Sequence, residues 1–89
     1  MKLWQTADVV RQPVGDELLL LEQGNGRLHH LNATAAWIYA NCDGRTSESL
    51  ADALTTRFEV EPDAALGDVL RVTGQLVELG LVQHGDPQT

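Results

Sequence analysis

The stretch ELLLLEQGNGRLHHLNATAAWIYANCDG, residues 17–44, carries the strongest signals for the fold. It begins with an apolar run and then reaches Gly24-Asn25-Gly26, residues that readily adopt the positive φ of a hairpin turn. After a second extended run comes Asn32, and asparagine is a preferred helix N-cap because its side chain accepts a free backbone N–H. The stretch therefore predicts a hairpin that leads directly into a helix, with strands over Glu17–Gln23 and Arg27–Leu31.

The residues before this stretch predict one further strand. Val9–Gln12 has the composition of a short strand. Pro13 and Gly15 are expected to end it, since proline lacks the N–H that a strand ladder needs. Together with the hairpin, this strand gives a three-stranded antiparallel meander in chain order. The third strand, Arg27–Leu31, then has an unpaired edge unless another segment covers it.

The residues after Asn32 predict three helices and a short closing strand. Residues that commonly start or end helices bound each of them, and apolar side chains recur at three- and four-residue spacing. The expected elements are a helix from Ala33 to about Cys42 stopped by Asp43-Gly44, a helix capped by Thr46 that carries Leu50, Leu54 and Phe58, a helix opened by Pro62 and Asp63 that runs to about Leu79, and an extended Leu81–Val82 after Gly80.

This order of elements gives the fold class α+β. The arrangement is winged-helix-like, with a three-stranded antiparallel sheet followed by three helices and a short wing. The 89 residues suit one small domain, and we expect a single domain over residues 1–89 with its core at about 9–82. The chain has one cysteine and no apolar run long enough to span a membrane, so a cytoplasmic protein without membrane contacts is expected.

The charge argues against a nucleic-acid partner. Thirteen acidic residues against six basic ones give a formal net charge of −7. Proteins that bind DNA or RNA gain affinity by placing lysine and arginine on phosphates. Here the bases are scattered along the chain, and Arg71 is the only base between residues 61 and 79, the expected third helix. We therefore expect no nucleic-acid partner, although the fold class includes DNA-binding proteins.

The histidine pair and the single cysteine do not predict a metal site or an enzyme. Neighbouring residues on a strand point to opposite faces, so His29 and His30 cannot easily ligate one ion. If Leu31 faces the helices, His29 shares that side and His30 joins Leu28 on the outer face. Cys42 lies near a helix C-terminus, where the helix dipole disfavours a thiolate. Without a nucleotide-binding or hydrolase motif, we expect no catalytic residue, cofactor or metal.

The run Leu18–Leu21 is apolar on both faces of its expected strand. A strand with one face in water should alternate between apolar and polar residues. Its second face is therefore expected either to meet another copy of the chain in a homodimer, or to lie under Trp4 and the N-terminal segment.

An ordered set of short motifs runs from the end of the third strand to the closing segment. The motifs are Leu31-Asn32, Ala33–Ile38, Cys42-Asp43-Gly44, Thr46, Leu50, Leu54, Phe58, Asp68-Val69 and Leu76 through Gly80-Leu81-Val82. This set resembles the PqqD family, named for the coenzyme PQQ synthesis protein D, and the resemblance covers about Val9–Val82. The stretch HHLNATAAWIYANCDGRTS also resembles a subgroup encoded with an HPr-kinase-related protein.

The resemblance implies a recognition element for precursors of ribosomally synthesised, modified peptides (RiPPs). Such a domain is a non-catalytic chaperone that binds the leader segment of a precursor peptide by β-strand addition. It then presents the peptide to a modifying enzyme, such as a radical SAM protein or an HPr-kinase-related protein, in the biosynthesis of a peptide-derived cofactor or natural product. The leader is expected to lie along the third strand and against the third helix.

Carried onto this chain, the resemblance implies eight peptide-binding residues. The third strand contributes Arg27, Leu28, His29 and His30, and the third helix contributes Asp68, Arg71, Val72 and Gln75. Asp68 matches an Asp-Val step of the family, and the other assignments follow from position. The alternative function is that of an acidic winged-helix regulatory or structural protein acting through protein–protein contacts, with DNA binding the less favoured form.

Overall fold

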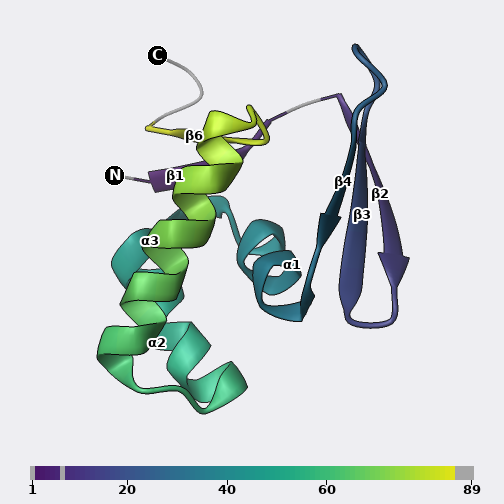
Figure 1. The fold of residues 1–89 in the computed structure, drawn as a ribbon. Helices are drawn as coiled ribbons and strands as arrows, with labels where there is room; N and C mark the ends of the chain where they lie inside the picture. Colours follow the sequence, from purple (N-terminus) through teal and green to yellow (C-terminus); the bar gives the residue numbers. More distant parts are fainter. Residues whose placement is uncertain (1, 7, 86–89) are drawn as a thin grey trace.

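The computed structural model describes residues 2–6 and 8–85, which form two antiparallel sheets and three helices (Figure 1). One sheet has the order β2-β3-β4 and the other has the order β5-β1-β6. The strands are β1 (Lys2–Gln5), β2 (Val9–Val14), β3 (Glu17–Glu22), β4 (Leu28–Leu31), β5 (Asp43–Thr46) and β6 (Val82–His84), and the helices are α1 (Ala33–Ala40), α2 (Ser47–Phe58) and α3 (Pro62–Glu78).

This architecture confirms the predicted fold class, and two of the predicted helix caps are present. The Asn32 side chain accepts a hydrogen bond from the backbone N–H of Ala35 at 2.9 Å, so α1 begins directly after β4. The Thr46 hydroxyl accepts one from the N–H of Ser49 at 3.1 Å and starts α2 in the same way. Both side chains satisfy N–H groups that have no partner within the helix.

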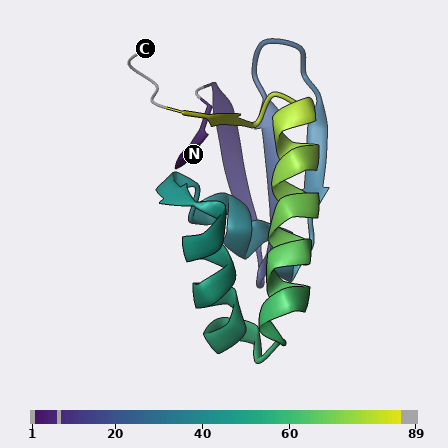
Figure 2. The same ribbon diagram turned by 90° about the vertical axis from the view of Figure 1, so that its left-hand side faces the viewer.

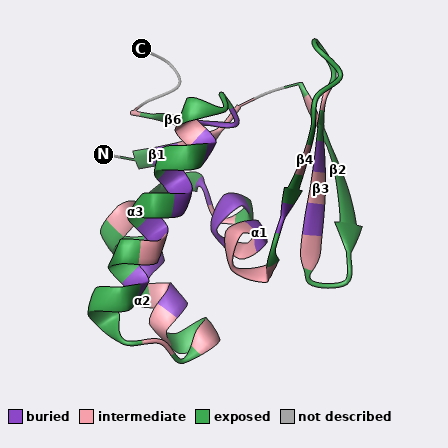
Figure 3. Cartoon of the chain, in the orientation of Figure 1, coloured by how far each residue is buried: buried purple, intermediate pink, exposed green. Residues whose placement is uncertain are grey.

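The hydrophobic core lies where α1 packs between the β2-β3-β4 sheet and the pair formed by α2 and α3 (Figures 1 and 2). Leu20 of β3, Ile38 of α1 and Val69 of α3 are each fully buried. Figure 3 shows that burial is concentrated on the sides of the elements that face α1. We call the side of the β2-β3-β4 sheet that faces the helices its inner face and the opposite side its outer face.

Two predicted boundaries in the β2-β3-β4 sheet are wrong. Strand β2 does not end before Pro13 but continues to Val14, which pairs with Glu17. Proline is tolerated there because β2 is an edge strand. The turn between β3 and β4 covers residues 23–27, because β3 ends at Glu22 and β4 begins at Leu28, one residue short of each predicted end. Of the three turn residues expected to have positive φ, only Gly26 has it, at 71°.

The sequence patterns did not predict the second sheet, β5-β1-β6. The predicted end of the first helix at Asp43-Gly44 is wrong, because α1 ends at Ala40 and Asp43–Thr46 forms β5. The closing strand begins at Val82, one residue later than predicted, continues to His84 and pairs with β1. Strands β1, β5 and β6 hold each other through residues distant in sequence, so no local period marks them.

The third helix keeps its predicted span but begins differently. Asp63 lies in the first turn, and the N-cap is Glu61, whose side chain makes no capping hydrogen bond. Pro62 occupies the first helical position, where its missing N–H costs nothing. Gly80, with a φ of 78°, ends the helix as predicted, and its N–H donates to the carbonyl of Val77 at 3.0 Å.

The N-terminal segment does not fold over the outer face of the β2-β3-β4 sheet. Strand β1 belongs to the other sheet, where the Trp4 indole packs on Gly44. Gly44 has a φ of 107°, and a Cβ atom there would lie 2.8 Å from Cη2 of Trp4. Only glycine fits this contact, because any side chain would be both strained and in collision with the indole.

The Gly44→Ala variant is therefore expected to destabilise the protein by about 1–3 kcal/mol, the usual cost of a strained backbone conformation. The control is Gly74→Ala in α3, where a new Cβ meets nothing within 4 Å. Alanine favours the helix, so this control is expected to gain about 0.5–1 kcal/mol. Urea unfolding of both variants measures the difference, and equal stabilities would contradict the assigned role of Gly44.

Candidate functional site

The β2-β3-β4 sheet has two edge strands, β2 and β4, and within residues 2–6 and 8–85 neither edge pairs with a further strand. In an antiparallel ladder, alternate residues direct their backbone N–H and C=O groups at the partner strand. The residues between them direct these groups away from the partner. The hydrogen bonds around the β3-β4 turn therefore decide which backbone groups each edge offers.

The edge of β4 offers both donors and acceptors. The N–H of Glu22 donates to the carbonyl of Arg27 at 2.8 Å, which marks these two residues as a hydrogen-bonded pair. Because such pairs alternate along the ladder, His29 and Leu31 also direct their groups at β3. Leu28 and His30 lie between them and point outward. The β4 edge thus presents two N–H groups and two carbonyls.

The edge of β2 is less suited to accept another strand. The N–H of Gln23 donates to the carbonyl of Asp8 at 3.1 Å, so the same alternation directs Val9, Arg11 and Pro13 outward. Pro13 has no N–H and places its ring at the edge. Proline at an edge strand commonly blocks the addition of another chain. The sheet is therefore open on the β4 side.

A pocket of about 250 Å³ adjoins the end of β4, between that strand, the first turn of α1 and one face of α3. Leu31, Ala35 and Val72 provide its apolar part, and of these Leu31 and Val72 are buried. Its other lining residues are polar: His30, Asn32, Thr34, Asp68, Arg71 and Gln75. An apolar floor with a polar rim is the usual form of a site that holds one side chain of a ligand.

The structure brings together five of the eight residues expected to bind a peptide. They line the pocket and are His30, Asp68, Arg71, Val72 and Gln75. Leu28 lies farther along the β4 edge and is 64% exposed. Arg27 precedes the strand, in the turn. His29 points to the inner face and lies outside the pocket.

The two histidines point to opposite faces, as strand alternation predicts, and each meets a different glutamate of β3. The Nε2 atom of His29 lies 2.7 Å from Oε2 of Glu22, with 13% and 18% of the two side chains exposed. His30 and Glu17 form the second pair at 2.5 Å, on the outer face and largely exposed. Across the described part of the chain, no three His, Cys, Asp or Glu side chains are grouped to hold a metal ion.

The charged side chains at the rim of the pocket can exchange their partners. Arg71 and Asp68 form an exposed pair at 3.4 Å, one turn apart on α3. Exposed pairs of this kind contribute at most about 1 kcal/mol. The Arg71 guanidinium can therefore leave Asp68 for a ligand carboxylate or carbonyl at small cost.

Cys42 is poorly placed for nucleophilic chemistry. Its side chain is buried, and its thiol donates a hydrogen bond to the carbonyl of Ile38 at 3.2 Å. Burial, and to a smaller extent the nearby Asp43 carboxylate, raises the pKa of the thiol to about 12. The thiolate that such chemistry requires is therefore scarce at neutral pH.

Sequence reasoning missed the part of the pocket that α1 provides. Asn32 was recognised as a cap, but its position and those of Thr34 and Ala35 beside α3 were not foreseen. The cap itself was a usable signal, because it fixes the start of α1 next to the end of β4. How close α3 approaches this start depends on helix packing, which no local pattern records.

Comparisons with known proteins show the family of the chain. The model of the family described as coenzyme PQQ synthesis protein D (PqqD) matches residues 17–82. The chain belongs to the PqqD family. The match covers the β3-β4 hairpin and all three helices, and thus every residue that lines the pocket. No curated protein matches the chain.

Two solved structures share the fold of this PqqD family member. One is TbiB1 in complex with the TbiA(beta) leader peptide, with 24% identity and a TM-score of 0.80 over 97% of this chain and 100% of that one. The other is a lasso peptide synthetase B1 complexed with the leader peptide, with 26% identity and a TM-score of 0.81 over 94% and 100%. Both proteins were thus solved with a leader peptide bound.

These comparisons do not favour the alternative of an acidic winged-helix regulatory protein. Among the residues described, no helix combines the length and apolar character that crossing a membrane requires.

The His29–Glu22 pair predicts a dependence of stability on pH. The hydrogen bond from His29 lowers the pKa of Glu22 from its usual value of 4.5, against a smaller opposing effect of desolvation. A carboxyl group with a lowered pKa stabilises the fold above its usual pKa, and this stabilisation is lost as the pH falls through the lowered value. We expect Glu22→Gln to be less stable than the natural chain at about pH 6, and this difference to shrink as the pH falls below 4.5 toward about pH 2.

Urea unfolding of the two proteins across this range measures the effect. A stability difference that does not change with pH would contradict the role assigned to the Glu22 carboxylate.

Proposed function

We propose that this PqqD family member is a non-catalytic adaptor that binds the leader segment of a precursor peptide by β-strand addition. The observation that carries the proposal is the open β4 edge beside the pocket on α3. The backbone groups of Leu28 and His30 point outward there, whereas Pro13 closes the opposite edge. Membership of the PqqD family and two similar structures with bound leader peptides support it.

The peptide would lie beside β4 as a fourth strand of the sheet. Its backbone exchanges hydrogen bonds with Leu28 and His30, which provides affinity with little dependence on the peptide's sequence. Side chains on a strand alternate between faces, so every second peptide side chain points to the inner face. One of these enters the pocket over Leu31 and Val72, where Asp68, Arg71 and Gln75 contact its neighbours.

This geometry supports a division of roles among the eight predicted residues. Leu28 and His30 bind the peptide through their backbone, and the α3 residues Asp68, Arg71, Val72 and Gln75 select its side chains. Arg27 contacts the peptide where it passes the turn. His29 holds β4 from the inner face through Glu22 and supports the edge without direct contact.

The adaptor would act in the cytoplasm with a modifying enzyme, either a radical SAM protein or an HPr-kinase-related protein, and would perform no chemistry itself. Its product would be a peptide-derived cofactor or natural product. The genes beside that of this chain test this part directly. A short precursor gene next to such an enzyme supports the assignment, and a neighbourhood without either contradicts it.

Binding by strand addition predicts that a single backbone N–H matters more than a side chain. His30→Pro removes an outward N–H, whereas His30→Ala removes the imidazole and keeps the N–H. Pro13 also directs its backbone outward, on the opposite edge of the sheet, and the sheet accepts proline at that edge position. We expect His30→Pro to weaken leader binding at least about tenfold and His30→Ala to change it less than about threefold.

Calorimetry with the leader peptides encoded beside this gene measures both affinities, and circular dichroism confirms that each variant is folded. Equal affinities of the two variants would contradict strand addition. The absence of binding to every encoded leader would contradict the function itself.

The pocket predicts a second effect that depends on a side chain. Gln75→Trp places an indole on the exposed α3 surface that borders the pocket, and it is expected to weaken leader binding at least about tenfold by excluding the peptide side chain. The control is Leu70→Trp, which adds the same ring on α3 outside the pocket, at a residue that is 53% exposed. The control should bind as the natural chain does, and equal losses in both variants would contradict the pocket.

A further inference from the structure

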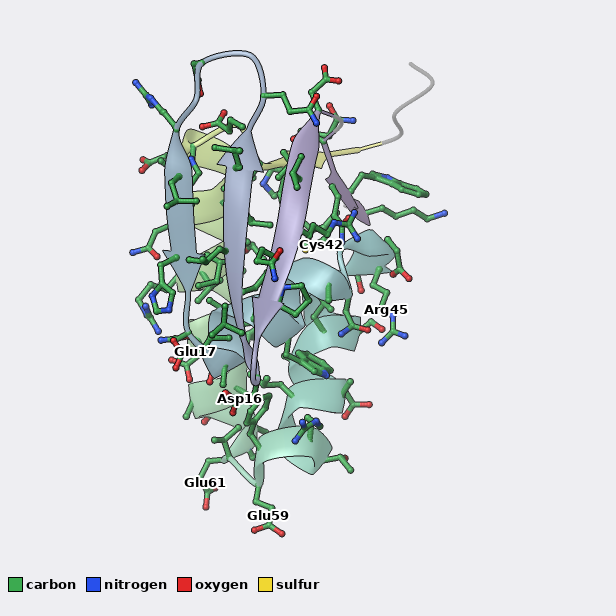
Figure 4. All side chains as sticks on the ribbon, turned by 90° about the vertical axis from the view of Figure 1, so that its right-hand side faces the viewer. Asp16, Glu17, Cys42, Arg45, Glu59 and Glu61 are labelled. Atoms are coloured by element: carbon green, nitrogen blue, oxygen red, sulfur yellow. The ribbon has the colours of Figure 1, made fainter. Side chains whose placement is uncertain are left out.

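The outer face of the β2-β3-β4 sheet is open to solvent, and no element of the described chain lies in front of it in Figure 4. The pairing register groups its side chains into rows across the three strands. One row consists of Val10, Leu21 and Leu28, and the next of Gln12, Leu19 and His30. Val14 and Glu17 complete the face at the end nearest the β2-β3 turn.

This face is unusually apolar for a surface in contact with water. Seven large hydrophobic residues of the described chain are exposed, and four of them lie here: Val10 at 43%, Val14 at 55%, Leu21 at 40% and Leu28 at 64%. Leu19 adds a fifth, partly exposed, apolar side chain. A contiguous apolar patch of this kind commonly marks a contact with another protein.

The face carries only one of the thirteen acidic residues, Glu17, although the chain has a formal net charge of −7. Its only ionisable groups are Glu17 and His30, and they pair with each other. The other exposed leucines differ in this respect. Leu66, Leu70 and Leu79 belong to α3 and its C-terminus, where Asp63, Asp68 and Glu78 are also found. Two acidic copies of the chain therefore repel least when they meet through the sheet.

We propose that the outer face binds the outer face of a second copy of the chain. A two-fold axis parallel to β3 sets the row of Val10, Leu21 and Leu28 against the same row in reverse order, so that apolar side chains meet apolar side chains. The same axis sets Gln12 opposite His30 of the second copy. Glu17 faces its own counterpart at the end of the contact, where its side chain is 44% exposed and solvent screens the repulsion between the two carboxylates.

The area of the face limits the stability of a dimer formed through it. Three strands about 4.8 Å apart, with about six residues of about 3.4 Å each, cover roughly 300 Å² per copy, or roughly 600 Å² for the two copies together. Stable complexes bury about 1,200–2,000 Å² in total. The contact is therefore a reversible equilibrium between monomer and dimer rather than a permanent assembly.

The dimer leaves the proposed peptide site accessible. The free N–H and C=O groups of Leu28 and His30 lie in the plane of the sheet, whereas the contact covers its outer side chains. Each copy can therefore still accept a fourth strand, and the dimer does not depend on whether a leader peptide binds.

Sedimentation of the full chain tests the proposal over concentrations from about 10 μM to about 1 mM, the range in which a small interface dissociates. We expect the average mass to rise toward that of a dimer. Leu21→Glu places a carboxylate in the apolar row and should lower the association constant at least about tenfold. The matched control Leu70→Glu adds the same charge on α3 and should associate as the natural chain does.

Val10→Glu provides a second variant in the same row, and thermal unfolding of all three shows that each is folded. A natural chain that stays monomeric up to the highest concentration would overturn the proposal, as would equal association of Leu21→Glu and Leu70→Glu. Leader binding, measured with the two His30 variants, is a separate result, so either proposal can fail without the other.

Discussion

The register between β3 and β4 is the constraint on which the rest of the structure depends. The pair of Glu22 and Arg27 starts the ladder, and every following pair is fixed by alternation. This register buries Leu18, Leu20 and Leu31 against the helices. It also decides that Leu28 and His30 direct their backbone groups outward. A slip of one residue would exchange the buried side chains for the exposed ones, and the backbone groups that point at β3 for those that point outward. Side chains and backbone groups alternate with the same period of two.

The pocket follows from how closely the sheet is joined to α1. Asn32 turns the chain from β4 into the helix without an intervening loop, so the first turn of α1 lies at the end of the open edge. Val69 and Leu76 of α3 are buried in the core, which holds the neighbouring Arg71, Val72 and Gln75 at the pocket. In the proposed site, the backbone edge would accept many peptide sequences, whereas the pocket beside it would add selectivity for one side chain. An adaptor that binds one segment of a longer peptide would use both the backbone edge and the pocket.

The strands of the meander, the caps of α1 and α2 and the end of α3 could be predicted because each depends on a few neighbouring residues. Gly80 ends α3 because it adopts a positive φ, and Asn32 begins α1 because its side chain reaches an N–H three residues away. Strand β5 could not be predicted in this way. Asp43-Gly44 has the composition of a helix stop. It nevertheless belongs to a strand, because it pairs with β1 and the Trp4 indole packs on Gly44. Such pairings depend on contacts between distant segments.

The sequence by itself determined the order of the three meander strands and the three helices, and the opposite directions of His29 and His30. These follow from local periods and caps, which act within a few residues. The tertiary structure alone decided that His30 and four residues of α3 line one pocket, that His29 does not, and that the outer face stays uncovered. These results depend on how the helices and the two sheets pack, because residues more than thirty positions apart meet only once the core has formed.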